Sequence, residues 1–244
     1  MQDKIFGRNP VLEAIKSGRE IDKIMVKKGG VEGSIKAIIK KAKENGIIVT
    51  EVEKQKLDAL CEGENHQGVL AFAAVCEYST VSDILNKAQE KGHAPFIIIC
   101  DKITDPHNLG SIIRTANCAG ADGVIIPKRN SVGLNMTVAK TSAGAVEYVP
   151  VAKVTNIAQT IDMLKEEGLW VAGADMDGEV MYKSNLDGAV ALVIGSEGEG
   201  ISRLVKEKCD FIVKIPMLGD VNSLNASVAA SVLMYEIVRQ RLDK

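Results

Sequence analysis

Residues 96–116 of this chain read FIIICDKITDPHNLGSIIRTA. The first five residues are an apolar run rich in β-branched side chains, which is typical of a strand covered on both faces. Asp105-Pro106 predicts a turn, and Asn108 is a good N-cap for a helix over 110–118. A buried strand that leads through a turn into a helix indicates an α/β fold with a parallel sheet.

The same rhythm continues toward the C-terminus. Apolar runs predict further buried strands at 123–126, 169–174, 189–194 and 211–215, and helical patterns lie between them at 156–167 and 201–208. A last helix is predicted from about Ser223 to Arg241, and it is apolar on nearly all sides until Glu236. We expect that helix to be deeply packed, in part against a partner chain. Residues 96–244 therefore predict one doubly wound α/β domain.

The first 76 residues predict a second, smaller α/β unit. Helical patterns at 8–16, 33–45 and 54–61 alternate with strand patterns at 23–28, 47–52 and 69–75. Residues 77–95 carry a helix-like pattern but end in KGHAP, which breaks regular structure, so we interpret them as a linker.

Composition and charge narrow the function classes. Of 244 residues, 46% are hydrophobic and 25% charged, which is ordinary for a globular protein with a real core. The net charge of −2 argues mildly against broad nucleic-acid binding. Residues 1–50, however, hold eleven Lys/Arg against six Asp/Glu, so this part could contact RNA. A solvated helix face explains the same charges equally well.

The remaining composition predicts neither a metal nor a membrane. Five cysteines without a CxxC spacing and three scattered histidines indicate no disulfide framework and no metal site. No apolar stretch reaches the length of a membrane span, and the first residues lack a signal sequence. We therefore expect a cytoplasmic protein.

Two further polar segments follow predicted strands, at 192–200 (LVIGSEGEG) and 215–230 (IPMLGDVNSLNASVAA). Ligands of open α/β sheets bind at such strand ends, and glycines let a backbone approach them closely. Glu197 could bind a hydroxyl or only tie down its loop, and Ser223 or Asn225 could open the last helix. The spacing G-S-E-G-E-G matches neither the dinucleotide fingerprint nor the P-loop, which disfavours a nucleotide-dependent oxidoreductase. Arg114 beside a helix start suits a phosphate or a pairing with a surface acid.

In order and spacing, the segments NLGSIIRTA, LVIGSEGEG and IPMLGDVNSLNASVAA resemble the three signature motifs of the SpoU (TrmH-type) RNA ribose 2′-O-methyltransferases of the SPOUT superfamily. IFGRNPVLEAI at 5–15 and NHQGV at 65–69 also resemble the substrate-binding domain of the ribosomal branch. The resemblance implies S-adenosylmethionine as cofactor, a homodimer and a C-terminal trefoil knot. Nothing in the pattern of residues predicts that knot.

The resemblance also implies roles for individual residues. Arg114 corresponds to the catalytic arginine, which in this family commonly serves a site built largely by the other protomer. Whether it acts as the base or orients a phosphate stays open, because arginine resists deprotonation. Asn108, Glu197, Ser223 and Asn225 match polar positions of the three motifs. The implied cofactor pocket is lined by Ala172, Gly173, Ile194, Gly195, Ile215, Met217 and Leu224.

The substrate that the resemblance implies is a guanosine of 23S ribosomal RNA, with residues 1–76 as the RNA-binding domain. One alternative is a tRNA guanosine-2′-O-methyltransferase of the same fold, although such members tend to lack this kind of N-terminal domain. A second alternative is a non-catalytic RNA-binding protein, which the matching polar residues disfavour.

Overall fold

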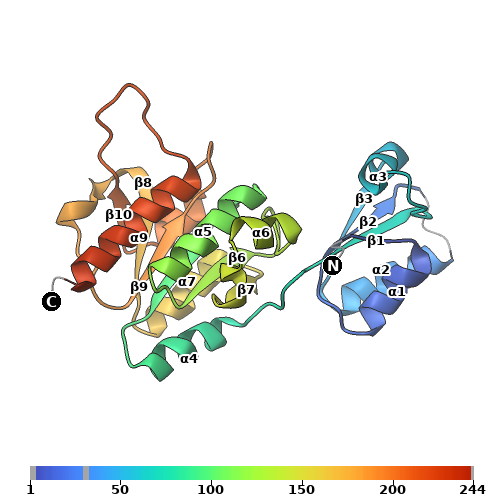
Figure 1. Ribbon diagram of the computed structural model, residues 1–244, viewed down its shortest axis with the longest axis horizontal. Helices are drawn as coiled ribbons and strands as arrows, with labels where there is room; N and C mark the ends of the chain where they lie inside the picture. The colour runs from blue at the N-terminus through green and yellow to red at the C-terminus, as the bar shows by residue number, and fades with distance from the viewer. Residues whose placement is uncertain (1–3, 30–32, 243–244) are drawn as a thin grey trace. The chain divides into compact units, whose positions relative to one another are not determined.

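The computed structural model describes residues 4–29 and 33–242, which form two compact units. The N-terminal unit comprises the described residues up to Glu77 together with Gly133–Met136. The C-terminal unit comprises Tyr78–Val132 and the described residues from Thr137 onward. Figure 1 labels most of the elements of both units, which are numbered in chain order.

The described part of the N-terminal unit has a four-stranded sheet in the order β1-β4-β2-β3. β2 and β3 are parallel, and β4 runs antiparallel to both β1 and β2. The strands are β1 (Lys4–Phe6), β2 (Ile21–Lys27), β3 (Ile48–Val52) and β4 (Val69–Ala73). The helices are α1 (Arg8–Lys16), α2 (Ser34–Glu44) and α3 (Lys54–Cys61).

Helices cover both faces of this small sheet because successive strand residues point to opposite sides. Ile24 and Val26 of β2 pack in one apolar cluster with α1 and α2, whereas Met25 between them packs with Leu57 of α3 in another. The three helices predicted from the sequence are confirmed, two of them with identical bounds. The short strand β1 was not predicted, since three residues carry too little pattern.

The C-terminal unit has a six-stranded sheet in the order β10-β8-β9-β5-β6-β7, in which every neighbouring pair is parallel. The strands are β5 (Phe96–Cys100), β6 (Gly123–Pro127), β7 (Val151–Val154), β8 (Trp170–Val180), β9 (Val190–Ile194) and β10 (Phe211–Lys214). The helices are α4 (Val81–Lys91), α5 (Pro106–Cys118), α6 (Met136–Thr141), α7 (Ile157–Glu166), α8 (Arg203–Lys208) and α9 (Ala226–Leu242). The predicted parallel α/β domain is therefore confirmed.

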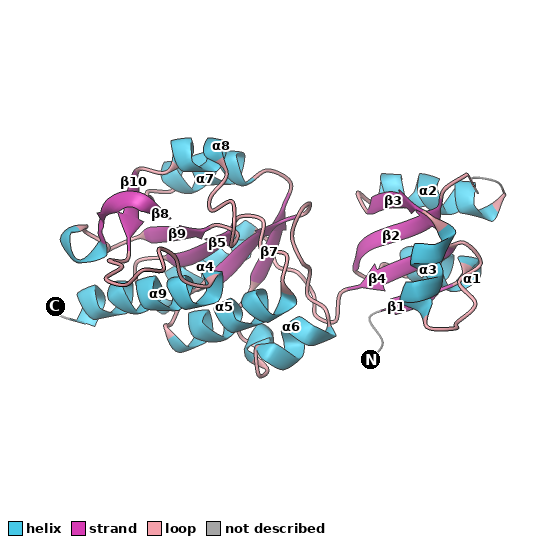
Figure 2. Ribbon diagram, turned by 90° about the horizontal axis from the view of Figure 1, so that it is seen from above, coloured by secondary structure: helices cyan, strands magenta, loops and turns pink. Residues whose placement is uncertain are grey.

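Two helical layers enclose this sheet, with α7 and α8 on one face and α5 and α9 on the other (Figure 2). Every residue of the central strands β5 and β9 is buried, which accounts for their unbroken apolar sequences. Of the described helices, none is long and apolar enough to cross a membrane. The knot implied by the resemblance stays a prediction.

The start of α5 corrects the sequence analysis. Asp105 is the N-cap, since its side chain accepts a hydrogen bond from the His107 amide at 2.9 Å, and Pro106 occupies the first helical position. Proline is favoured there because that residue needs no amide donor. The prediction of Asn108 as N-cap was therefore wrong: Asn108 lies inside the first turn, and its side chain is free to point elsewhere.

Candidate active site

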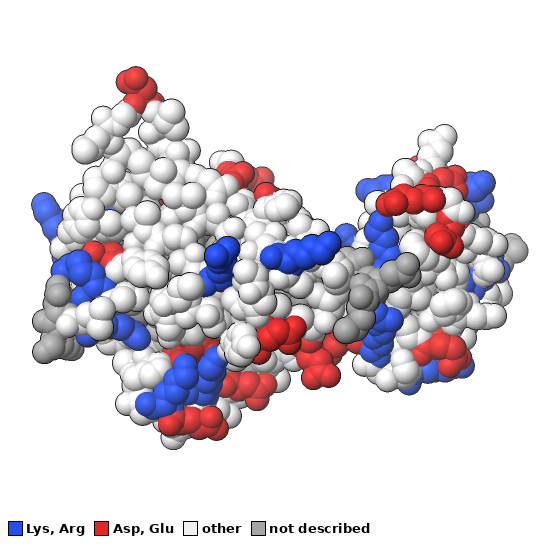
Figure 3. All heavy atoms as spheres, viewed as in Figure 1, with Lys and Arg blue, Asp and Glu red and all other residues white. Residues whose placement is uncertain are grey.

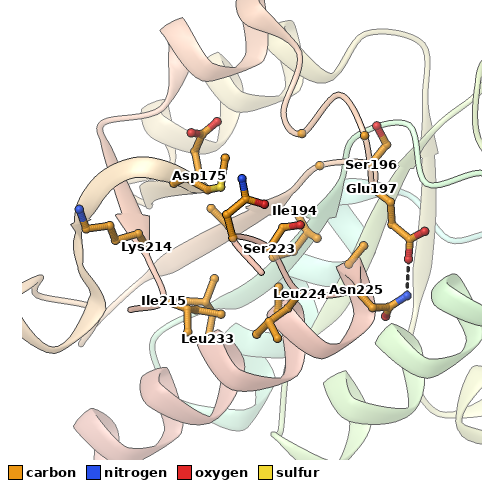
Figure 4. Close-up of a pocket in the computed structure, with 18 of the residues that line it drawn as sticks. Asp175, Ile194, Ser196, Glu197, Lys214, Ile215, Ser223, Leu224, Asn225 and Leu233 are labelled. Atoms are coloured by element: carbon orange, nitrogen blue, oxygen red, sulfur yellow. Dashed lines mark hydrogen bonds between the residues drawn. The ribbon is translucent and has the colours of Figure 1, made fainter. Parts of the chain in front are cut away.

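A cavity of about 750 Å³ lies beside the middle of β8 and the ends of β9 and β10 (Figure 4). Its lining comes from Ala174–Met176 of β8, the segment Ile194–Gly200 after β9, Val213–Ile215 and Met217 at the end of β10, and Asn222–Ala226, Ala229 and Leu233 around the start of α9. Parallel strand ends are the usual ligand edge of such a sheet. The cavity therefore joins two of the three polar or glycine-rich segments that the sequence marks, those that follow β9 and β10, whereas the start of α5 lies outside its lining.

One side of this cavity is apolar and the other is polar. Figure 4 shows Ile215, Leu224 and Leu233 lying together along one side. The polar lining includes Asp175 near β8 and Glu197 in the loop after β9. A site with an apolar wall and a few fixed polar groups is typical of small-molecule binding.

Gly195 has no room for a side chain. A Cβ there would lie 2.0 Å from the carbonyl carbon of Gly200 and 2.2 Å from the amide nitrogen of Ile201. The loop folds back on itself because the Ser196 amide donates to the Gly200 carbonyl at 3.1 Å and the Gly200 amide donates to the Ser196 carbonyl at 2.9 Å. The glycine thus permits a tight turn whose backbone forms part of the cavity wall.

Three polar side chains from distant segments meet beside this loop. The Asn108 side-chain amide donates to Glu197 Oε1 at 3.0 Å, and the Asn225 amide donates to Asn108 Oδ1 at 2.9 Å. Asn225 also donates to the same Glu197 oxygen, and Figure 4 marks this hydrogen bond. The network joins α5, the loop after β9 and the segment before α9, so it holds the three motifs in one geometry.

Asn225 has a second function as the N-cap of α9. Its Oδ1 accepts hydrogen bonds from the amides of Ser227 at 3.0 Å and Val228 at 3.3 Å. An N-cap oxygen in this position satisfies backbone donors that the first helical turn leaves open. Of the two residues that the sequence offers as the start of the last helix, Ser223 and Asn225, the structure selects Asn225, and the helix begins at Ala226.

The structure places most of the predicted cofactor-binding residues around this cavity. Ile194, Gly195, Ile215, Met217 and Leu224 line it, as does Ser223. Ala172 and Gly173 do not, because both lie buried within β8. A Cβ on Gly173 would lie 2.8 Å from Ile212 Cδ1, so this glycine serves the packing of β8 against β10.

The contribution of β8 begins further along than the sequence analysis predicted. The strand does not end at Ala174 but continues to Val180, so Ala174, Asp175 and Met176 reach the cavity instead. Asp175 forms an ion pair with Lys206 at 3.1 Å, and this hydrogen bond raises the pKa of Lys206. Asp175 was not predicted as a site residue, although an acidic residue directly after a buried apolar run is a usable signal.

Arg114 lies on α5 with its side chain exposed, and it does not line the cavity of the single chain. Within residues 4–29 and 33–242 its guanidinium forms no hydrogen bond or ion pair. It is therefore available to an external phosphate or to another protomer. Over the same described ranges, no group of three His, Cys, Asp or Glu side chains is placed to hold a metal ion.

Comparisons with known proteins agree with this geometry. The model of the SpoU rRNA Methylase family matches residues 95–235, and that of the RNA 2′-O ribose methyltransferase substrate-binding family matches residues 4–79. YacO of Bacillus subtilis, whose name places it among the TrmH-family tRNA/rRNA methyltransferases, is 50% identical over 98% of this chain and 96% of its own length.

Two solved structures share the fold. The SpoU methyltransferase AviRb from Streptomyces viridochromogenes, solved in complex with AdoMet, superimposes with a TM-score of 0.63 at 22% identity over 99% of this chain and 91% of its own. The TrmH/SpoU tRNA modifying enzyme of A. aeolicus has a TM-score of 0.56 at 24% identity, over 65% of this chain and 83% of its own. With both family models and a half-identical relative covering its length, the chain belongs to the SpoU (TrmH-type) family of RNA methyltransferases.

Proposed function

We propose that this protein transfers a methyl group from S-adenosylmethionine to the ribose 2′-oxygen of a guanosine in 23S ribosomal RNA. The observation that carries the proposal is the cavity beside β8 and the ends of β9 and β10, with the Asn108–Glu197–Asn225 network on its rim. Family membership supports the chemistry, and the complex of AviRb with AdoMet supports the cofactor.

The cavity fits such a cofactor. Its volume of about 750 Å³ lies within the range of about 300–1,000 Å³ found for small-molecule sites. The apolar wall of Ile215, Leu224 and Leu233 suits a flat purine, and the close backbone at Gly195 suits polar groups of the ligand. Backbone groups of Ile194–Ser196 and Ile215–Met217 would hold it. When bound, the cofactor supplies an electrophilic methyl group on a sulfonium.

The remaining chemistry falls to side chains of this protein. They must align the attacking ribose oxygen and help to remove its proton. We propose that Arg114 stays protonated, orients a phosphate of the RNA and stabilises the developing negative charge on the 2′-oxygen, because arginine resists deprotonation. Glu197 Oε1 accepts hydrogen bonds from the side-chain amides of Asn108 and Asn225, and it thereby fixes the loop that would border the bound cofactor.

We further propose that two copies form a homodimer through α9. Val228 and Tyr235 are 46% and 51% exposed, and their spacing of seven residues places them along one side of the helix. The surface over α9 and α5 is mostly uncharged (Figure 3). A partner that covers this face would bring its own Arg114 toward the cavity. A monomer in sedimentation at working concentration would contradict the dimer.

Two observations favour ribosomal RNA over tRNA as the substrate. Residues 4–79 match the substrate-binding family model, and the tRNA modifying enzyme of A. aeolicus covers only 65% of this chain. A dedicated module is suited to the shape, phosphates and hydroxyls that structured RNA presents. We also place the enzyme in the cytoplasm, where such RNA is made.

The test uses methyl-labelled S-adenosylmethionine with two unmodified substrates, a large-subunit ribosomal transcript and a tRNA pool. We expect label at one guanosine of the ribosomal transcript, mapped as a 2′-O-methyl group. Label only in tRNA would support the proposed methyl transfer but would show that the substrate is tRNA and not ribosomal RNA. Label in neither RNA, nor in particles from ribosome assembly, would overturn the proposed function.

A further inference from the structure

A second strand edge, in the N-terminal unit, has the geometry of a ligand site. β1 and β2 both run antiparallel to β4, and β2 is parallel to β3, so β1, β2 and β3 share one direction. Their carboxyl ends therefore lie at the same edge as the start of β4. Ligands of α/β sheets collect at such edges.

A cavity of about 710 Å³ lies at this edge. Each connection contributes to its lining: Arg8 follows β1, Lys27 ends β2, Lys54 follows β3, and His66–Gly68 precede β4. These connections include both N-terminal segments that the sequence analysis singled out, at 5–15 and 65–69. The topology thus brings the two segments into one site.

The wall formed by residues 66–68 is rigidly held. The buried His66 accepts a hydrogen bond from the Gly68 amide on Nδ1 at 2.9 Å, so its proton lies on Nε2 and is donated to Asp58 Oδ1 at 2.8 Å. Arg8 Nε donates to the Gln67 carbonyl at 3.0 Å. Gly68 adopts a positive φ of 82° and Gln67 one of 48°. Such a conformation in a non-glycine residue persists only where its surroundings hold it.

The charges in this cavity favour an anion. Lys27 and Lys54 are exposed, and neither ammonium group forms a hydrogen bond or ion pair with any described residue. Arg8 adds a third positive charge. Two carboxylates, Asp58 and Glu64, also line the cavity, but Asp58 already accepts a hydrogen bond from His66. The three positive charges outnumber the two negative ones, although Lys54 and Lys27 also attract the Asp58 carboxylate electrostatically.

The three helices of this unit begin at the same edge. α1 begins at Arg8, α2 at Ser34 and α3 at Lys54, and residues from all three first turns or their neighbours line the cavity. Neither Gly7, Gly33 nor Glu53, the N-cap residues, makes a side-chain capping bond. At the start of α1, the Arg8 amide donates a long hydrogen bond to Gln67 Oε1, at 3.3 Å. The partial positive charge of helix starts adds to that of the side chains.

We propose that this cavity binds a backbone phosphodiester of the RNA substrate, held by Arg8, Lys27 and Lys54; this inference rests on the proposed function. No Phe, Tyr or Trp is among the described residues that line the cavity, so it lacks the platform on which an unstacked base would lie. A phosphate requires only the cations and amides present. The site therefore sets the register of the RNA without reading its sequence.

The test measures binding of the full-length protein to the large-subunit ribosomal transcript over a series of salt concentrations. The variant is the double substitution Lys27→Gln/Lys54→Gln, and the matched control is Lys43→Gln. Lys43 is an exposed lysine without a described partner, nine residues along α2 from Ser34 and hence about 13 Å from the helix start. Circular dichroism checks that each variant folds. Methyl transfer by the wild type is measured on the same preparation of RNA.

We expect the double variant to bind about tenfold or more weakly, and its plot of log affinity against log salt to be shallower by about 1 to 2. The control should change neither quantity appreciably. Two outcomes overturn the phosphate site but leave the proposed function standing, provided that the wild type methylates the RNA. One is an unchanged salt slope in the double variant. The other is a loss of RNA affinity in Lys43→Gln equal to that in the double variant. Absence of methylation of any RNA overturns the proposed function, and this inference with it.

Discussion

Both units have a cavity at the carboxyl ends of parallel strands, but the starts of their helices differ in how they are capped. In the C-terminal unit, Thr80, Asp105, Asn156 and Asn225 each accept a backbone amide at the start of α4, α5, α7 and α9. The shorter α8 lacks such a bond to its N-cap side chain. In the described part of the N-terminal unit, the N-cap residues of α1, α2 and α3 form no side-chain cap, and the start of α1 has only the long bond from the Arg8 amide to Gln67 Oε1.

This difference separates two uses of a helix start. A side-chain cap satisfies the first amides and fixes the loop, which suits a site where reacting atoms must be aligned. An uncapped start leaves donors and a positive end for a ligand, which suits contact with a phosphate. We therefore interpret the C-terminal unit as the one that aligns reacting atoms and the N-terminal unit as the one that binds a negatively charged ligand.

The largest expected effect is that of Arg114→Lys in the capped unit. The substitution keeps the charge but removes the planar fork that can orient a phosphate and an oxyanion together. We expect kcat for methyl transfer to fall by about 100-fold or more, whereas binding of S-adenosylmethionine, measured by calorimetry, stays near that of the wild type. Near-normal turnover in this variant would refute the role of Arg114.

Asn225→Ala tests the side-chain cap at the start of α9 in the C-terminal unit. Loss of the cap on α9 should lower the free energy of unfolding by about 1–2 kcal/mol, and loss of the bonds to Asn108 and Glu197 should reduce methyl transfer by about tenfold. Asn225→Ser is the matched control, because serine can cap the helix but is too short to join the network. Thermal melting should recover in Asn225→Ser while activity does not; recovery of both would show that the network is dispensable.

Glu53→Asp adds a side-chain cap at the start of α3 in the N-terminal unit, where the N-cap residue forms none. Glu53 has an extended backbone with φ of −65° and ψ of 148°, which a capping aspartate can adopt without a change of charge. We expect the unfolding free energy to rise by about 0.5–1 kcal/mol and RNA affinity to fall by about twofold, because the new cap occupies amides at the phosphate site. Glu44→Asp, at the far end of α2, is the control. Higher stability with unchanged affinity would mean that the start of α3 does not contribute to RNA binding.

The smallest effect concerns the pH dependence of a cap. Asp83 accepts hydrogen bonds from the Thr80 amide and hydroxyl, at 2.7 and 2.8 Å, and the backbone bond is the main reason that its pKa lies below the ordinary value. A lowered carboxyl pKa stabilises the fold above the unfolded-state pKa, and that contribution disappears as the pH falls through the folded-state value. Asp83→Asn should therefore lower the melting temperature slightly at neutral pH and leave it unchanged in acid.

The control for this titration is Glu90→Gln on the same helix, because the Glu90 side chain forms no hydrogen bond with a described residue. It should have a small effect at any pH. A gap between wild type and Asp83→Asn that persists in acid would assign the effect to helix propensity rather than to the charged cap.

Local sequence pattern was sufficient for most elements but not for the site. The apolar runs at β5 and β9 predicted buried strands, because each residue there is covered on both sides. The start of α5 was misplaced although Asp105-Pro106 carried the signal, since the same pair also predicts a turn. β7 and α6 are too short to stand out, and β8 extends through polar residues that do not suggest a strand.

The contacts of the site could not be read from spacing. Glu197 and Asn108 are 89 positions apart, and Asn225 and Asn108 are 117 apart, so only the folded sheet brings them together. The resemblance named the residues, but it did not predict that one network joins them. The phosphate site of the N-terminal unit likewise depends on strand direction, which the alternation of strands and helices did not specify.

The double role of Asn225 has a consequence for motion. Because one side chain both begins α9 and holds Glu197, fraying of the first helical turn and loosening of the cavity rim are a single event. Amide hydrogen exchange at Val228 should therefore report on the cavity although this amide lies in the helix. By linkage, a ligand that holds the rim must slow that exchange, and the effect of the ligand on the helix and of the helix on the ligand share one coupling free energy.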